Sequence, residues 1–137
     1  EIKVIAALRG LKSDDGAFGT DQGAESGTTA STSFAAMILN YMEESTDYCV
    51  SWLLKQQHSD GGFRAVARMP FSDIQSTVYT MMALYFTAPE AFKTISADAK
   101  RFILSQQKEN GFSGHCKDET TTLENTFLAL CGLGLVK

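Results

Sequence analysis

The chain has 137 residues, with twelve Lys and Arg against sixteen Asp and Glu, and a formal net charge of −4. A hydrophobic fraction of 44% with 20% charged residues excludes intrinsic disorder, which needs low hydrophobicity and high net charge. No apolar run approaches the ~20 residues that cross a bilayer, and Lys and Arg do not cluster as a nucleic-acid partner requires. We therefore expect one folded domain with no membrane span and no nucleic-acid partner.

The three cysteines, Cys49, Cys116 and Cys131, are an odd number and too few for a disulfide scaffold. This usage favours a reducing, cytoplasmic location. The adjacent pair His115-Cys116 has no further Cys or His at the short spacing of zinc sites, so we interpret both residues as loop positions. The chain starts at Glu1 rather than Met, which we interpret as the truncation of a longer chain.

The predicted elements form three units, each a helix, a glycine turn, an irregular loop and a second helix. The predicted units, each with its two helices, are 1–44 (2–11 and 30–43), 45–92 (47–57 and 73–87) and 93–137 (96–108 and 121–135). Recurrence of one supersecondary unit at a period of about 45 residues is typical of repeat architectures.

The turns give the clearest evidence of repetition. Asp15-Gly16-Ala17-Phe18 recurs 45 residues later as Asp60-Gly61-Gly62-Phe63 and again in the shortened form Asn110-Gly111-Phe112. Glycine permits a positive φ, and a preceding Asp or Asn bonds nearby backbone. We therefore assign these acidic and amide side chains to turn formation rather than to catalysis.

The two helices of each unit differ in polarity. The first is predicted to be amphipathic and outer, whereas the second carries long apolar blocks such as 34–39 and 78–86. A helix that is apolar nearly all round is buried on several sides. The sequence offers no convincing strand alternation, so the predicted class is an all-α repeat with outer and inner helices.

The segment from Gln57 to Phe63 has a Gln, three residues, a Gly, any residue and an aromatic. With the ~45-residue period, it resembles the superfamily of protein prenyltransferase β subunits and terpenoid cyclases, most closely a prenyltransferase β-subunit repeat. The resemblance implies an α/α toroid, in which a ring of inner helices is surrounded by outer helices, usually in six hairpins. Three hairpins then make half a ring, as a fragment of a larger toroid.

The resemblance also implies an activity, the transfer of an isoprenoid group to a protein Cys whose thiolate is held by zinc. Asp73 matches one zinc ligand of the family, but Gln75 stands where a Cys is needed, and Glu124 and Asn125 occupy the region of the expected His. The cationic residues that hold the isoprenoid diphosphate have no counterpart cluster. We therefore expect no zinc, no metal site and no binding of an isoprenoid diphosphate in this segment alone, and whether the parent protein is an enzyme stays open.

Two other branches of the superfamily are alternatives. Cyclases protonate their substrate with the middle Asp of an acidic motif, and Gln75 in the corresponding stretch 73–77 is no strong Brønsted acid. Thioester-containing domains of complement and macroglobulin-type proteins resemble the segment 52–64, although their hallmark motif is absent. The alternative function is thus a non-catalytic toroid-like module that binds a protein or an apolar ligand.

The candidate ligand-binding residues lie on the inner helices. They are Phe34, Asp73, Gln75, Tyr79 and Phe127. The aromatic members recur between units and could line a cavity for an isoprenoid-like ligand, although aromatics at helical spacing more often form core, which we favour for most of them. Half a ring leaves two open helix faces. We therefore predict self-association, with two copies completing a ring, or packing against the rest of a larger chain.

Overall fold

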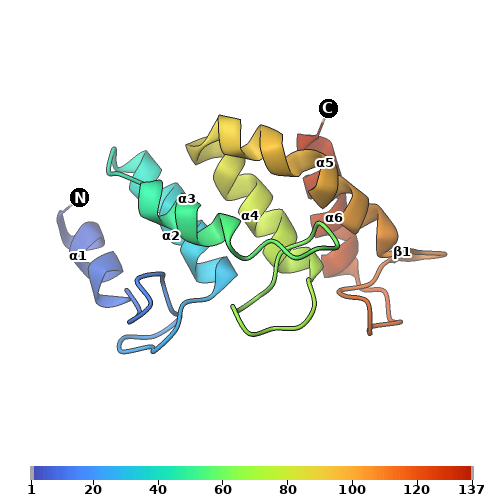
Figure 1. Ribbon diagram of the computed structural model, residues 1–137, viewed down its shortest axis with the longest axis horizontal. Helices are drawn as coiled ribbons and strands as arrows, with labels where there is room; N and C mark the ends of the chain where they lie inside the picture. Colours follow the sequence, from blue (N-terminus) through green and yellow to red (C-terminus); the bar gives the residue numbers. More distant parts are fainter. Residues whose placement is uncertain (1, 137) are drawn as a thin grey trace.

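The computed structural model describes residues 2–136, and the predicted unit ends Glu1 and Lys137 lie outside this range. The elements are, in order, α1 (Ile2–Gly10), α2 (Thr29–Tyr41), α3 (Asp47–Leu54), α4 (Ile74–Thr87), α5 (Pro89–Ser105), β1 (Gln107–Lys108), β2 (Gly111–Phe112) and α6 (Leu123–Leu135). Helices α2, α4 and α6 form a row, here called the inner row, with α3 packed on α2 and α4, and α5 on α4 and α6 (Figure 1). The predicted all-α helical repeat is confirmed.

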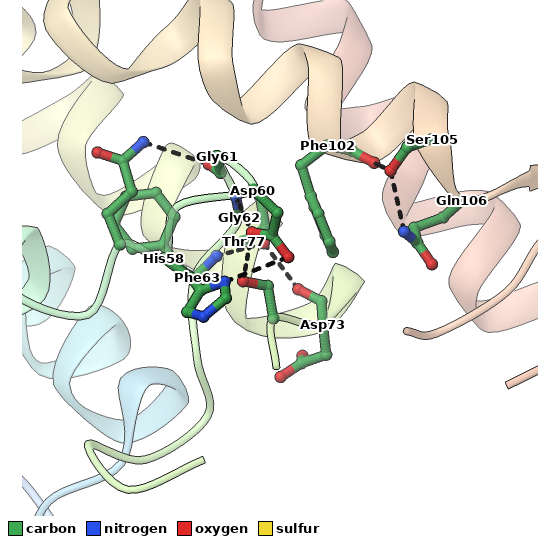
Figure 2. A network of polar contacts seen from close by, with 12 residues as sticks. His58, Asp60, Gly61, Gly62, Phe63, Asp73, Thr77, Phe102, Ser105 and Gln106 are labelled. Carbon is green, nitrogen blue, oxygen red and sulfur yellow. Dashed lines mark hydrogen bonds and ion pairs between the residues drawn. The ribbon is translucent and has the colours of Figure 1, made fainter. Parts of the chain in front are cut away.

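One hydrogen bond recurs in every unit and ties its turn to its inner helix. A backbone N–H of a turn Phe donates to the hydroxyl of a Thr 14 residues later. The three bonds join Phe18 to Thr32 at 3.1 Å, Phe63 to Thr77 at 2.9 Å (Figure 2) and Phe112 to Thr126 at 3.1 Å. Because a buried N–H needs a partner, these bonds fix the rotation of each inner helix relative to its turn.

The N-terminal caps of the inner helices give the same register. Thr28, Asp73 and Thr122 each accept a hydrogen bond from the backbone N–H three residues later. These caps are 45 and 49 residues apart. At these spacings the counterpart of Tyr79 in α6 is Leu128. The predicted equivalence of Phe127 with the other two inner-helix aromatics was therefore wrong by one residue.

The hydrophobic core is centred on α4. Ile74, Val78, Met81 and Leu84 are fully buried, in contact with α5 and α6. A second cluster joins α2 and α3 around Trp52. The prediction that inner helices are buried on several sides thus holds for α4. It was wrong for α2 and α6, which expose large apolar side chains because each has an inner-row neighbour on one side only.

The third unit differs from its predicted outline. Helix α5 begins at Pro89 instead of residue 96, with Ala88 alone between it and α4. Proline suits the first turn of a helix, where its missing N–H costs no bond. The predicted unit boundary at 92/93 falls inside this helix. The stretch predicted to end the helix at 108 instead forms β1, paired antiparallel with β2, although no strand was predicted there.

Cys49 is buried in the cluster around Trp52. Burial raises the pKa of its thiol to about 11. Cys116 is exposed, and Cys131 is half-buried. Within residues 2–136, none of the helices combines the length and the apolar character needed to cross a bilayer.

Candidate functional site

A cavity of about 510 Å³ lies at the N-terminal ends of the inner row. Its lining includes the caps Thr28 and Asp73, together with Gln75 and two residues of the last loop, His115 and Asp118. Helix N-termini and loops from three units therefore meet here. Two of the predicted site residues, Asp73 and Gln75, are part of this cavity.

Asp73 holds the start of α4. One carboxylate oxygen accepts the backbone N–H of Ser76 at 2.7 Å, and the other accepts its hydroxyl at 2.8 Å. Burial raises the pKa of Asp73, and this effect outweighs the lowering by the bonds from Ser76. Both oxygens are thus engaged within the helix, so the side chain acts first as a cap.

Gln75 joins two inner helices. Its side-chain amide donates to a carboxylate oxygen of Glu124 at 3.1 Å, across the ends of α4 and α6. Both residues are exposed. This contact uses the amide of Gln75 as a donor, which an ionised Asp at the same position could not replace and a Cys thiol could replace only weakly.

His115 is a site residue that the sequence analysis assigned only to a loop. The ring of His115 stacks on the ring of Phe71, with centroids 4.6 Å apart. Lys117 lies over the Phe71 ring, 5.5 Å from its centroid. Asp118 accepts the backbone N–H of Gly114 at 3.2 Å and so shapes the same loop. No local sequence signal links Phe71 to His115, because they belong to different units.

An aromatic stripe extends from this cavity along the inner row. We define it by residues four, three and four positions apart, which share one side of an α-helix: Ala30, Phe34, Met37 and Tyr41 on α2, and Gln75, Tyr79, Met82 and Phe86 on α4. The rings of Phe34 and Tyr79 are in contact, with centroids 4.9 Å apart. Phe34, Tyr41 and Phe86 are exposed, whereas Tyr79 and Met82 are half-buried. The cavity is lined by Ala30 and Gln75, the first residues of the two halves, so cavity and stripe are continuous.

The direction of the stripe follows from the recurring Thr bonds. Thr32 and Thr77 face the turns that follow the outer helices. A residue two positions later in an α-helix points about 200° away from the first. Phe34 and Tyr79, two positions after these threonines, therefore lie on the side of the inner row opposite to the turns. Phe34 is exposed on this side, whereas Tyr79 is half-buried and packs against the core cluster centred on α4. Phe127 is exposed on another side of α6 and is not brought together with them.

The acidic turn residues have the structural role that the sequence predicts. Asp15 accepts the backbone N–H groups of Ala17 and Gly27 at 3.2 and 3.1 Å. Asp60 likewise accepts the N–H of Gly62 at 2.9 Å and the hydroxyl of Ser72 at 2.8 Å, beside the ring of His58 (Figure 2). Each carboxylate closes its turn onto the loop that leads to the inner helix.

Comparison with known proteins agrees with this geometry. None of the curated proteins compared with the chain matches it. A family model, the prenyltransferase alpha-alpha toroid domain, matches residues 32–137. This match spans most of the chain, including the whole of α4, α5 and α6. The chain therefore belongs to the family of prenyltransferase alpha-alpha toroid domains.

Proposed function

We propose that this chain forms part of the wall of an isoprenoid-binding cavity, in a toroid like that of protein prenyltransferase β subunits. The observation that carries the proposal is the aromatic stripe, where Phe34 and Tyr79 make contact at equivalent positions of two units. A row of exposed aromatic and Met side chains offers a long apolar ligand a large contact area. Exposed apolar rows of this kind mark ligand or partner sites more often than chance.

The residues at the N-terminal ends of the inner row do not fit a zinc site. Zinc prefers thiolate, imidazole and carboxylate ligands. Beside Asp73, the chain has Gln75 where the family resemblance implies a Cys, and Asn125 in the region where it implies a His. Within residues 2–136, no three His, Cys, Asp or Glu side chains come together in a way that could hold a metal ion. We therefore propose that this segment contributes apolar binding and does not activate a thiol.

The charge at the cavity favours a neutral ligand end over a diphosphate. Asp73 and Asp118 both line it, and none of its lining residues in the described part of the chain is a Lys or Arg. A diphosphate here would face these two carboxylates, and the cation beside the cavity, Lys117, lies over the ring of Phe71. The ligand class that fits the segment is thus a neutral isoprenoid, such as an isoprenyl alcohol or thioether.

The test is a fluorescence titration with two probes, dansyl-labelled farnesol and dansyl-labelled farnesyl diphosphate. We expect saturable binding of the neutral probe and none of the diphosphate. Tyr79→Ala removes aromatic contact worth ~1.5 kcal/mol or more, so it should weaken binding about tenfold.

Leu104→Ala is the control for this titration. Leu104 is a large, exposed apolar residue of the outer helix α5 and lies outside the stripe. It should bind the neutral probe like the wild-type chain, with circular dichroism confirming that both variants are folded. Equal loss of binding in the two variants, or tighter binding of the diphosphate probe, would show that the stripe is not the site.

A further inference from the structure

One side of α6 is exposed where the same side of the preceding inner helices is buried. By the register of the caps, Ile74, Val78 and Met81 of α4 correspond to Leu123, Phe127 and Leu130 of α6. The three α4 residues are 0% exposed, whereas their counterparts are 87%, 64% and 59% exposed. We call Leu123, Phe127 and Leu130 the α6 face.

A backbone bond repeats this pattern. The N–H of Thr29, first residue of α2, donates to the carbonyl of Ala65 in the next unit at 2.9 Å. The N–H of Ile74, first residue of α4, donates to the carbonyl of Gly114 at 2.8 Å. The equivalent N–H of Leu123 donates to no carbonyl within residues 2–136. Side chains and backbone of α6 thus present the surface that elsewhere receives a following unit.

The opposite end of the inner row carries the complementary surface. Ala83 of α4 is fully buried and packs in the cluster of α2. A side-chain carbon at its α6 counterpart, Gly132, would meet Val78 of α4. This position therefore faces the preceding inner helix. The residue of α2 at the position equivalent to Ala83 and Gly132 is Ile38. Ile38 is exposed and lines an apolar groove of about 280 Å³ together with Leu8 of α1. We call this surface the α2 groove.

We propose that the α6 face of one copy of this chain packs into the α2 groove of a second copy. The argument is the continuity of an interface that the chain already contains twice, between α2 and α4 and between α4 and α6. The α6 face and the α2 groove are the two halves of that interface left without a partner in the described chain. The contact is head-to-tail, and three hairpins make half of a six-hairpin ring, so two such contacts close two copies into a ring.

The test is the mass of the 137-residue chain by sedimentation velocity over a range of concentrations. We expect a species of twice 14.9 kDa. Phe127→Glu and Ile38→Glu each bring a charge into both contacts of the ring, so each should raise the dimer dissociation constant more than about 100-fold. Leu104→Glu, on the exposed surface of α5, is the matched control and should leave the dimer intact.

Mixing distinguishes this arrangement from other pairings. One copy carrying Phe127→Glu and one carrying Ile38→Glu retain a single unaltered contact between them, so their mixture should contain more dimer than either variant alone. Circular dichroism should show both variants folded, since both side chains are exposed in a single copy. A wild-type monomer at all concentrations, a dimer insensitive to Ile38→Glu, or a mixture without added dimer would each overturn the proposal.

Discussion

Replacing the buried hydroxyl of Thr77 tests the recurring bond between turn and inner helix. Thr77→Val keeps the shape of the side chain but removes the acceptor of the Phe63 N–H, which lies 2.9 Å away. Thr77 and Phe63 are both fully buried, so water cannot replace the lost partner. An unsatisfied buried donor costs about 1–3 kcal/mol of unfolding free energy.

Urea denaturation followed by circular dichroism measures this cost. With a slope of about 1–3 kcal/mol per molar urea, the midpoint of Thr77→Val should fall by about 1 M. Thr87→Val is the control, because the half-buried hydroxyl of Thr87 only donates to the carbonyl of Ala83 in the same helix. It should change the unfolding free energy by less than about 0.5 kcal/mol. Equal midpoints for the two variants would refute the role given to Thr77.

Three further predictions concern a cap, two glycines and the thiols. Burial raises the pKa of Asp73, so folding favours the protonated carboxyl, and the contribution of Asp73 to stability falls as pH rises above about 4. The stability of Asp73→Asn relative to wild type should therefore increase between about pH 3 and pH 7 in urea titrations. A stability difference that is constant over this pH range would contradict the raised pKa. Gly61 and Gly23 both have positive φ, but an added side-chain carbon meets the backbone of α5 only at Gly61. Gly61→Ala should therefore lower the unfolding free energy, measured by thermal denaturation, by about 1–3 kcal/mol more than Gly23→Ala. Equal losses in the two variants would be inconsistent with that contact. Because the pKa of the Cys49 thiol is raised, Ellman's reagent at about pH 8 should modify the exposed Cys116 in the folded chain and Cys49 only after unfolding. Rapid reaction of both thiols in the folded chain would argue against the burial of Cys49.

The repeat was predictable from the sequence because its signals are local. The Asp-Gly turns, the caps and the apolar helices all act within a few residues, and they gave the helix order and the turn roles of Asp15 and Asp60. The start of α5 was missed because the predicted helices 73–87 and 96–108 did not include residues 89–95, although Pro89 is a good first helical residue. The strands at 107–112 are too short to show alternation.

The candidate site was predictable only in part, since it depends on contacts between units. Asp73 and Gln75 were placed together, and Phe34 and Tyr79 do make contact. Phe127 was misplaced because the register of the third unit is set by Thr126 and Thr122, not by the nearest aromatic. Burial was overestimated for α2 and α6 because an apolar sequence does not reveal which neighbours are present.

Photolabelling with a neutral farnesol analogue that carries a benzophenone tests the proposed ligand surface most directly. Mass spectrometry of the labelled chain should find the modification in peptides that contain Phe34 or Tyr79, and unlabelled farnesol should reduce it. Labelling concentrated on the outer helix α5, or labelling that farnesol does not compete away, would contradict an isoprenoid site on the aromatic stripe.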